Sequence, residues 1–436
     1  MNNYYLAIDL GASSGRHIIG FKNQNGKIIL REVYRFRTGM DDSPDGLVWD
    51  INRIYKDILF GIKEAFKKYK NIISLSIDAW GVDYVLLDGD KPIPPYYAYR
   101  NNRCLKAEKV INSIINPKEL YKINGIQHAP FNTINQLYAD KIENRLERAT
   151  DYLMLPCYFS YLLTGQKVHE YTNESTTGLL NARTGKYSSK IIDSLDLPKN
   201  LFTKMHFPSE KIGVLLPNIE KEVKGNCNVV LCASHDTASA FEAVDSDEDS
   251  VIISSGTWSL LGIKAPLPII NEKAMKANYT NEGGPNYIRF LKNIMGMWIN
   301  NKIKEKSLLD QDYIDKNITS IDYRITFDVN DPSLRAPTNM KDAVLKLLSK
   351  CPPRNDLELL CSVYRSMAKS YNVAIKELED ITERNYQNIY IVGGGAKNKF
   401  LNNLVEKYTG KRVIALPIEA SALGNIKIQM KANGDL

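Results

Sequence analysis

Long apolar runs are missing from this sequence of 436 residues. No segment reaches the roughly 18 consecutive apolar residues that a membrane-spanning helix needs. The chain opens on a strand-like stretch, residues 4–8, without the basic and apolar regions of a signal peptide. These absences argue against a membrane partner and lead us to expect a cytoplasmic protein.

Cysteine is scarce, and the usual metal-binding patterns are missing. The six cysteines are dispersed, with no CxxC pair and no Cys/His spacing of a metal site. Two pairs, Cys227/Cys232 and Cys351/Cys361, lie close enough in sequence to form disulfides, but a reducing compartment disfavours them. We therefore expect free thiols, because a chain of this length can bury a self-supporting core.

The excess of one charge is small. The chain has 57 Lys and Arg against 50 Asp and Glu, a net charge of +7 that is spread along the sequence. One dense basic run, residues 63–70, fits either a nucleic-acid patch or the solvated face of a helix. The helix is favoured, because the apolar residues here form one helical stripe with the lysines opposite. The stripe consists of Ile54, Ile58, Ile62, Ala65, Phe66 and Tyr69. We expect no nucleic-acid partner.

Strand and helix signals alternate through the first 90 residues. Their order predicts a mixed sheet covered by helices. Gly/Ser and Asn-Gly turns separate the early strands, and the helix is amphipathic. The predicted strands are residues 4–10, 17–21, 28–36, 72–77 and 82–87, and the predicted helix is 50–68.

The pattern restarts near residue 250. Residues 251–263 again predict strand, small-residue turn and strand, residues 357–378 a long helix, and residues 389–392 a buried strand. Two loosely similar halves imply two related α/β domains that face a cleft, and the length fits two or three domains. The polar turn near residue 245 divides them into domains 1–244 and 245–436.

The first candidate phosphate loop follows the first strand. Asp9 ends that strand, and a tight turn of Gly, Ala and Ser residues leads to Arg16. Small residues let backbone N–H groups approach an anion. Asp9 is placed to hold a hydrated Mg²⁺, which usually takes one or two carboxylates. The alternative is an ordinary hairpin with an Asx-type turn.

Two later segments have a similar composition. Residues 254–259 could contact a terminal phosphate, with Gly256 and Thr257 as donors. The glycine triplet 393–395 lies between a strand and a helix, which favours a nucleotide near the helix N-terminus. The triplet fits neither GxGxxG nor GxxxxGK(S/T), so it is neither a dinucleotide-binding motif nor a P-loop. A plain hairpin, with Trp258 in the core, and a close helix–sheet junction are the alternatives.

Asp236 is the candidate catalytic residue. It follows His235 after the apolar run 229–231 and precedes an Ala-rich helix. An aspartate there can accept a hydroxyl proton while helix-terminal N–H groups hold it ionised. Asp before such a helix is also a common N-cap, so local chemistry leaves both roles open. Residues 77–83 and the region of Asn293 add polar side chains suited to a cleft.

Seven segments together resemble one family. They are AIDLGASSGR, DAWGVDYVLLD, EYTNESTTGLLN, ASHDTASA, ISSGTWSLLG, NEGGPNYIRFLKNIMGMW and VGGGAKNKFL. They occur in the order seen in the rhamnulokinase branch of the FGGY carbohydrate kinases. The resemblance implies two actin-like (ribonuclease H-like) ATPase domains around a central cleft, and Asp236 as the general base of an ATP-dependent sugar kinase.

The resemblance also implies roles for individual residues. ATP contacts fall on Ala12, Ser13, Ser14, Gly15, Arg16, Thr257, Asn301, Gly393, Gly394 and Gly395. Sugar contacts fall on Gly81, His235, Asp236, Thr237 and Asn293. Asn301 stands where we associate the family with glutamine, and its shorter side chain leaves that contact open.

The implied reaction is phosphorylation of the 1-hydroxyl of L-rhamnulose by ATP–Mg²⁺, giving L-rhamnulose 1-phosphate in rhamnose catabolism. The expected partners are this sugar and ATP, and the expected assembly is a monomer or homodimer. One alternative is an FGGY kinase for L-fuculose, L-xylulose or glycerol. Others are an actin-like ATP-binding switch, or a binding-only remnant, since the family usually continues past Leu436.

Overall fold

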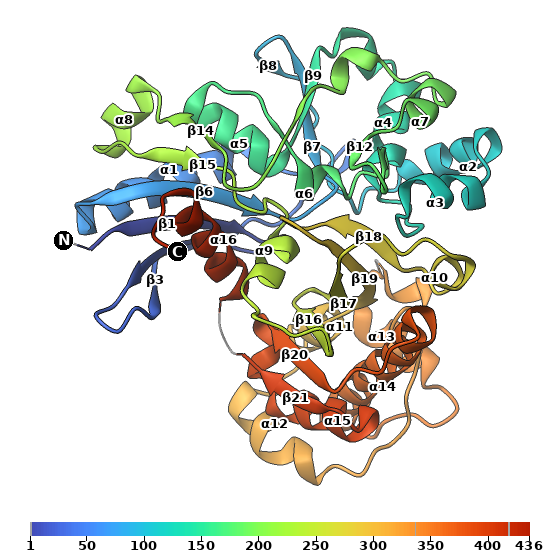
Figure 1. The fold of residues 1–436 in the computed structure, drawn as a ribbon. Helices are drawn as coiled ribbons and strands as arrows, with labels where there is room; N and C mark the ends of the chain where they lie inside the picture. Colours follow the sequence, from blue (N-terminus) through green and yellow to red (C-terminus); the bar gives the residue numbers. More distant parts are fainter. Residues whose placement is uncertain (1, 336, 417–418) are drawn as a thin grey trace. The chain divides into compact units, whose positions relative to one another are not determined.

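The computed structural model describes residues 2–335, 337–416 and 419–436 (Figure 1). The chain divides into two compact units. Unit 1 contains residues 2–243, 264–290 and 420–436, and unit 2 contains residues 244–263 and 291–419. The first division lies close to the predicted boundary. Unit 1, however, also takes in two later segments that the predicted domains place in the second half.

Unit 1 is built on a six-stranded sheet in the order β14-β15-β6-β1-β2-β3. β1 pairs antiparallel with β2 and parallel with β6, and β6 pairs parallel with β15. The strands are β1 (Tyr4–Leu10), β2 (Gly15–Lys22), β3 (Ile28–Phe36), β6 (Ile72–Ala79), β14 (Lys211–Val214) and β15 (Asn228–Val230). The predicted strands in this region are confirmed, with β2 and β6 each longer than predicted.

The central strand β1 is buried on both faces, as the Cβ alternation of a strand requires. Tyr5 and Ala7 join a core cluster with α16 (Ala420–Ala432). Leu6, Ile8 and Leu10 join a larger cluster with α1 (Ile51–Lys68). Figure 1 shows α16 lying against β1, which is the N-terminal strand. This packing is the reason that residues 420–436 belong to unit 1.

Helix α1 confirms the predicted amphipathic helix. Its N-cap Asp50 accepts a hydrogen bond from the backbone N–H of Arg53, and its buried residues include Ile54, Ile58 and Ile62. The lysines of the basic run, by contrast, are exposed. The run is therefore a solvated helix face, as predicted.

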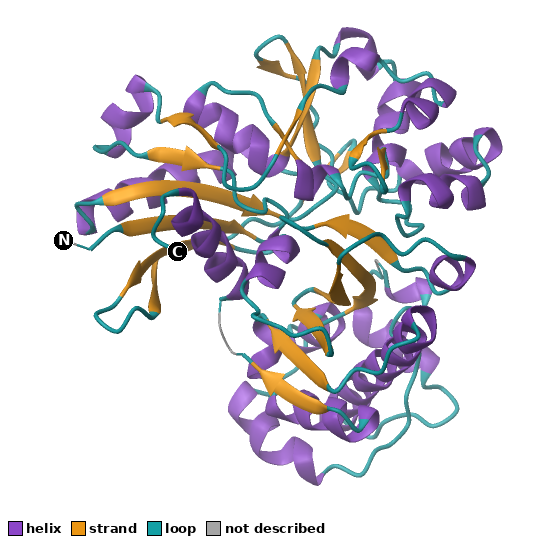
Figure 2. Ribbon diagram, viewed as in Figure 1, coloured by secondary structure: helices purple, strands orange, loops and turns teal. Residues whose placement is uncertain are grey.

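The rest of unit 1 covers the sheet and forms a second core (Figure 2). The predicted strand 82–87 begins only at Tyr84, because Val82 has a φ of 70° and interrupts the extended backbone. The strands are β4 (Asp41–Ser43), β5 (Gly46–Val48), β7 (Tyr84–Asp88), β8 (Lys91–Pro92), β9 (Asp151–Met154), β10 (His169–Glu170), β11 (Leu180–Asn181), β12 (Lys186–Tyr187), β13 (Met205–His206) and β18 (Thr280–Gly283). The helices are α2 (Cys104–Ile114), α3 (Pro117–Asn124), α4 (Thr133–Ile142), α5 (Leu155–Thr164), α6 (Tyr171–Glu174), α7 (Ser189–Ser194), α8 (Pro217–Val223), α9 (Asp236–Glu242) and α10 (Glu272–Lys276), with 3-10 turns at Arg145–Arg148 and Lys199–Leu201.

Unit 2 repeats the pairing pattern of unit 1. β16 (Ser250–Ser255) pairs antiparallel with β17 (Trp258–Ala265) and parallel with β20 (Asn388–Val392), which pairs parallel with β21 (Arg412–Ala415). The predicted restart of the pattern near residue 250 is confirmed. The predicted long helix is α14 (Asp356–Thr382). The remaining elements are β19 (Ile288–Met295), which begins in unit 1, α11 (Trp298–Lys304), α12 (Gln311–Asn317), α13 (Met340–Leu347), α15 (Lys399–Thr409), and 3-10 turns at Ile318–Ser320, Pro332–Leu334 and Gly394–Lys397.

Two expectations from composition can be compared with this fold. All six cysteines are free, as expected, and five of them are buried. Among the helices that the structure describes, none combines the length and the apolar character needed to cross a bilayer.

Candidate active site

Three carboxylates gather at one edge of the unit 1 sheet. β1 and β6 run parallel, so their carboxyl ends lie together, and Asp9 pairs in register with Asp78. Ala79, the next residue of β6, bridges in parallel to His235. Asp236 follows directly and begins helix α9. The sheet thus brings Asp9, Asp78 and Asp236 together from positions far apart in the chain.

Asp9 and Arg16 form an ion pair across the first hairpin. The Arg16 Nη2 donates to Asp9 Oδ2 at 2.5 Å, and the Asp9 side chain is only 3% exposed. The predicted phosphate loop lies between them, closed by a hydrogen bond from Gly11 N to Ser14 O at 3.0 Å. Gly15 has a packing explanation, since a Cβ there would meet the Phe36 ring at 2.3 Å.

Asp78 is a buried carboxylate of the segment 77–83 that was not predicted to be a site residue. Burial raises its pKa well above the ordinary value, and the neighbouring Asp9 raises it further. Asn425 of α16 donates to Asp78 Oδ2 at 2.6 Å. The available signal was its place as a charged residue near the end of an otherwise apolar strand.

Asp236 occupies the first position of α9 rather than the cap. The N-cap is His235, whose side chain makes no capping hydrogen bond, so the N-cap alternative for Asp236 is wrong. The Asp236 side chain is 28% exposed and its Oδ1 accepts from Thr237 Oγ1 at 3.1 Å. Burial raises the pKa of Asp236, while His235 and the Thr237 hydroxyl lower it. A carboxylate with a raised pKa is a stronger proton acceptor.

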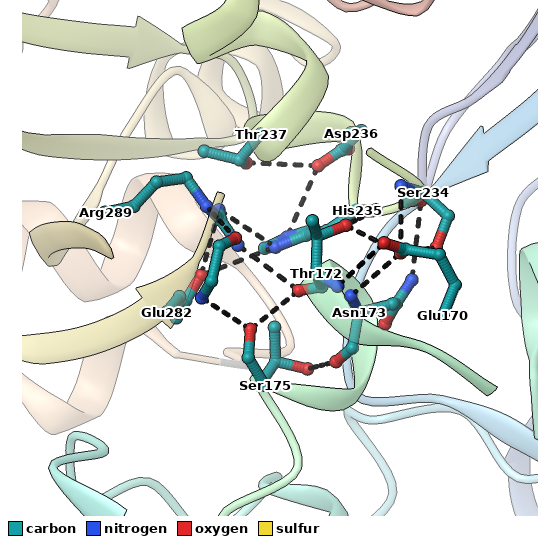
Figure 3. A network of polar contacts seen from close by, with 12 residues as sticks. Glu170, Thr172, Asn173, Ser175, Ser234, His235, Asp236, Thr237, Glu282 and Arg289 are labelled. Carbon is teal, nitrogen blue, oxygen red and sulfur yellow. Dashed lines mark hydrogen bonds and ion pairs between the residues drawn. The ribbon is translucent and has the colours of Figure 1, made fainter. Parts of the chain in front are cut away.

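His235 connects Asp236 to a buried polar network (Figure 3). Its Nε2 lies 3.5 Å from Asp236 Oδ1. On the other side of the ring, Arg289 Nη1 lies 3.1 Å from Nδ1 and Glu282 Oε2 lies 3.4 Å from it. A Cβ added at Gly81 would stand 3.3 Å from His235 Nε2. Unit 1 therefore brings together the predicted sugar positions 81, 235, 236 and 237.

The backbone around His235 is held by Glu170, a fully buried residue at the start of α6. Glu170 accepts from the N–H groups of Thr172 at 2.9 Å, Asn173 at 3.2 Å and Ser234 at 3.1 Å. Three backbone donors on one carboxylate fix the segment that precedes the candidate base. Glu170, Glu282 and Arg289 were not predicted as site residues, because nothing local distinguishes them from surface charges.

Asp83, the second carboxylate of the 77–83 segment, has a structural role. Its Oδ2 accepts from the indole N–H groups of Trp49 at 2.7 Å and Trp80 at 3.0 Å, and from Tyr99 N at 3.2 Å. Gln136 Nε2 donates to the other oxygen at 3.0 Å. Burial raises the pKa of Asp83 to about 6, and these hydrogen bonds lower it. Asp83 orders the aromatic surroundings of Gly81.

In unit 2 the second turn and the glycine triplet lie side by side, because β16 and β20 are parallel neighbours. A Cβ at Gly393 would lie 2.9 Å from Ser255 O, and one at Gly395 2.0 Å from Ser255 Oγ. Close packing therefore explains these two glycines. Gly394 is exposed and would meet nothing within 4 Å, so packing does not require a glycine there.

The other predicted unit 2 positions are accessible to different degrees. Thr257 and Asn293 are partly exposed, and Asn301 is exposed on α11. Trp258 is partly exposed rather than in the core.

A protein-only metal centre is not part of the described structure. Among residues 2–335, 337–416 and 419–436, no group of three or more His, Cys, Asp and Glu side chains is arranged to hold a metal ion. Magnesium bound with a nucleotide needs only one or two carboxylates, with water and phosphate oxygens completing its shell. The carboxylate of Asp9 fits that more modest requirement.

Comparison with known proteins agrees with this arrangement. Residues 4–241 match the N-terminal domain of the FGGY family of carbohydrate kinases, and residues 251–433 match its C-terminal domain. A rhamnulokinase of Oceanobacillus iheyensis is 42% identical over 99% of this chain and 94% of its own length. The rhamnulokinase of Bacillus subtilis is 38% identical over 98% of this chain and 90% of its own length.

Solved structures show the same fold at low sequence identity. A xylulose kinase from Lactobacillus acidophilus has a TM-score of 0.83 at 17% identity, covering 99% of this chain and 90% of that one. Plasmodium falciparum glycerol kinase with ADP has a TM-score of 0.76 at 14% identity, covering 100% and 90%. The predicted two-domain, actin-like kinase fold is thereby confirmed. With matches to both domains and to relatives over nearly its whole length, the chain belongs to the FGGY family of carbohydrate kinases.

Proposed function

We propose that the protein transfers the γ-phosphoryl group of ATP to the 1-hydroxyl of L-rhamnulose. One observation supports the substrate and another the reaction type. The named relatives at 34–42% identity are rhamnulokinases. The observation that carries the reaction type is the position of Asp236, a partly exposed carboxylate beside His235, whose ring lies against Gly81, at the carboxyl edge of the sheet.

Asp236 acts as the general base. Its carboxylate accepts the proton of the 1-hydroxyl while the hydroxyl oxygen attacks the γ-phosphorus. The bond between the γ-phosphorus and the bridging oxygen breaks, and ADP leaves. Gly81, His235, Thr237 and Asn293 orient the sugar. The Thr237 hydroxyl, already bonded to Asp236 Oδ1, holds the carboxylate in position.

ATP is held by the two small-residue turns and the glycine triplet. In unit 1 the contacts are Ala12, Ser13, Ser14, Gly15 and Arg16, and in unit 2 they are Thr257, Asn301 and residues 393–395. Asp9 would hold the nucleotide's Mg²⁺, which would supply charge neutralisation at the phosphate oxygens. Arg16, paired with Asp9, adds a positive charge beside the same loop.

The test is a coupled ADP-release assay with ATP and a panel of L-rhamnulose, L-fuculose, L-xylulose and glycerol. We expect L-rhamnulose to give the highest kcat/KM and its product to carry phosphate on O1 by NMR. A higher kcat/KM for another member of the panel would change the assigned substrate but not the assignment as a kinase. ATP hydrolysis that no sugar stimulates would overturn the proposal in favour of an ATP-binding switch.

A further inference from the structure

We propose that Arg289 and Glu282 are positioning residues that hold His235 in one neutral tautomer, with its proton on Nε2 and directed toward Asp236 and the sugar. This inference rests on the proposed function, since it gives His235 a defined part in sugar recognition. It assigns roles to two buried charges that the phosphoryl-transfer chemistry itself does not use.

Arg289 determines which ring nitrogen carries the proton. The side chain is fully buried, and a guanidinium has hydrogen-bond donors only. Its Nε donates to Gly283 O at 2.9 Å, its Nη2 to Thr172 O at 3.4 Å and its Nη1 to His235 Nδ1 at 3.1 Å. A proton on Nδ1 would place two donors against each other at that distance. Nδ1 is therefore the acceptor, and the proton of a neutral ring is on Nε2.

Glu282 balances the charge of Arg289. Its Oε2 lies 3.1 Å from Arg289 Nη1 and 3.4 Å from His235 Nδ1, so the carboxylate is nearer to the guanidinium. Burial alone would raise the pKa of Glu282, but Arg289 and, to a lesser degree, His235 lower it below the ordinary value. The ionised carboxylate makes a buried arginine tolerable, because an unpaired buried charge is strongly destabilising.

The charged groups that face His235 thus have opposite effects. Glu282 and Asp236 each present a carboxylate oxygen to a ring nitrogen, whereas Arg289 presents only a donor to Nδ1. Figure 3 shows Arg289 and Glu282 on one side of the ring and Asp236 on the other. Without the arginine, Glu282 would remain as an acceptor near Nδ1, which favours the tautomer with its proton there.

A fixed Nε2–H has two consequences for the site. It can donate to Asp236 before the sugar binds and to a sugar oxygen afterwards, since Nε2 lies 3.5 Å from Asp236 Oδ1 and faces Gly81, which has no side chain. A neutral ring also leaves Asp236 more basic than an imidazolium neighbour would. The site should therefore prefer substrates with an acceptor oxygen next to the hydroxyl that is phosphorylated.

The test reads the tautomer directly by NMR. The chain has five histidines, so protein labelled with ¹⁵N-histidine gives few imidazole signals, and His235→Gln identifies the relevant one. In long-range ¹H–¹⁵N spectra near neutral pH we expect His235 with an unprotonated Nδ1 and a protonated Nε2. A wild-type spectrum with Nδ1 protonated overturns the proposal, whether or not the sugar assignment holds.

Variants of Arg289 test the cause. We expect Arg289→Met to shift His235 toward a protonated Nδ1, to add a new ionisation to the pH profile of kcat/KM, and to lower kcat/KM by about 10- to 100-fold. Arg289→Lys, which keeps a charged donor, should partly restore the tautomer, the pH profile and kcat/KM. Arg324→Met, at an exposed ion pair, is the control. A folded Arg289→Met protein with the wild-type tautomer and pH profile would contradict the assignment.

Discussion

His169 and Glu174 form a buried ion pair, with His169 Nδ1 3.0 Å from Glu174 Oε1. Asp151 Oδ1 lies 3.1 Å from the other ring nitrogen. Burial opposes charging of the ring, but the two carboxylates outweigh it and raise the pKa of His169 to about 9. The effect expected of this pair is on stability.

Protein stability should fall in mildly alkaline solution because of this histidine. A base whose pKa is raised on folding stabilises the fold fully below its unfolded pKa, near 6.5, and loses that contribution as the pH rises through about 9. The full contribution is about 3 kcal/mol. Urea unfolding of wild type and His169→Gln at several pH values measures it. The difference between the two proteins should shrink above pH ~9, and a pH-independent difference would contradict the ion pair.

Acid should destabilise the protein because of His17, whose pKa is shifted in the opposite direction from that of His169. Burial lowers the pKa of His17 to about 4, although its bond to Ile58 O at 3.0 Å raises it slightly. The unfolded chain binds a proton near pH 6.5 and the folded chain does not, so stability falls as the pH drops from about 6.5 toward about 4. His17→Phe keeps a ring against Gly61 and should reduce this loss. Chemical unfolding near pH 7 and near pH 5 would show it, and equal acid sensitivity of both proteins would refute it.

Loss of the Asp236 carboxylate should abolish most turnover while sparing sugar binding. General-base catalysis is typically worth about 10²–10⁴-fold, so Asp236→Asn should lose at least that in kcat. Calorimetry with L-rhamnulose should still detect binding. Ser421→Ala, on the partly exposed side of α16, serves as the control and should retain activity. Near-normal turnover of Asp236→Asn would remove Asp236 from the base position.

Gly424 tests whether the contact between α16 and α9 positions the base. A Cβ at Gly424 would lie 1.7 Å from Ser239 O of α9, so Gly424→Ala must push the two helices apart. We expect a loss of about 1–3 kcal/mol in stability and a lower kcat, because α9 begins at Asp236. Thermal unfolding and steady-state kinetics measure both. A variant with wild-type stability and kcat would mean that α9 does not need this contact.

The glycine triplet allows packing and nucleotide binding to be separated. Gly395→Ala would collide with Ser255 Oγ and should destabilise unit 2, whereas Gly394→Ala has space and should not. If residue 394 contacts ATP, Gly394→Ala should raise the KM for ATP about 10-fold, a loss near 1.4 kcal/mol, with the KM for sugar unchanged. An unchanged KM for ATP would mean that Gly394 does not contact ATP and that the triplet serves packing alone.

Most of the secondary structure could be predicted from local signals. β1 and β3 follow from apolar runs bounded by turn residues, and α1 follows from its 3.6-residue stripe. These elements are set by neighbours in sequence. The membership of α16 in unit 1 could not be predicted in this way, because it depends on Ile426 and Met430 packing on a strand about 420 residues earlier.

The candidate site was predictable where it depends on motifs and not where it depends on burial. His235 and Asp236 stand out at a strand end before a helix. Arg289 and Glu282 do not stand out, because a charged residue is usually exposed. Arg289 also lies 54 residues away in sequence from its contact His235. The glycines show the converse limit, because Gly15 and Gly395 suggest phosphate binding but are already required by packing.

The return of the chain to unit 1 also affects its synthesis on the ribosome. Residues 5 and 7 emerge first, yet their buried contacts with Ala422 and Ile426 can form only after all of unit 2 has been translated. One apolar face of the N-terminal sheet therefore stays uncovered while unit 2 is translated. We expect nascent chains that stop before residue 420 to need chaperone protection at this face.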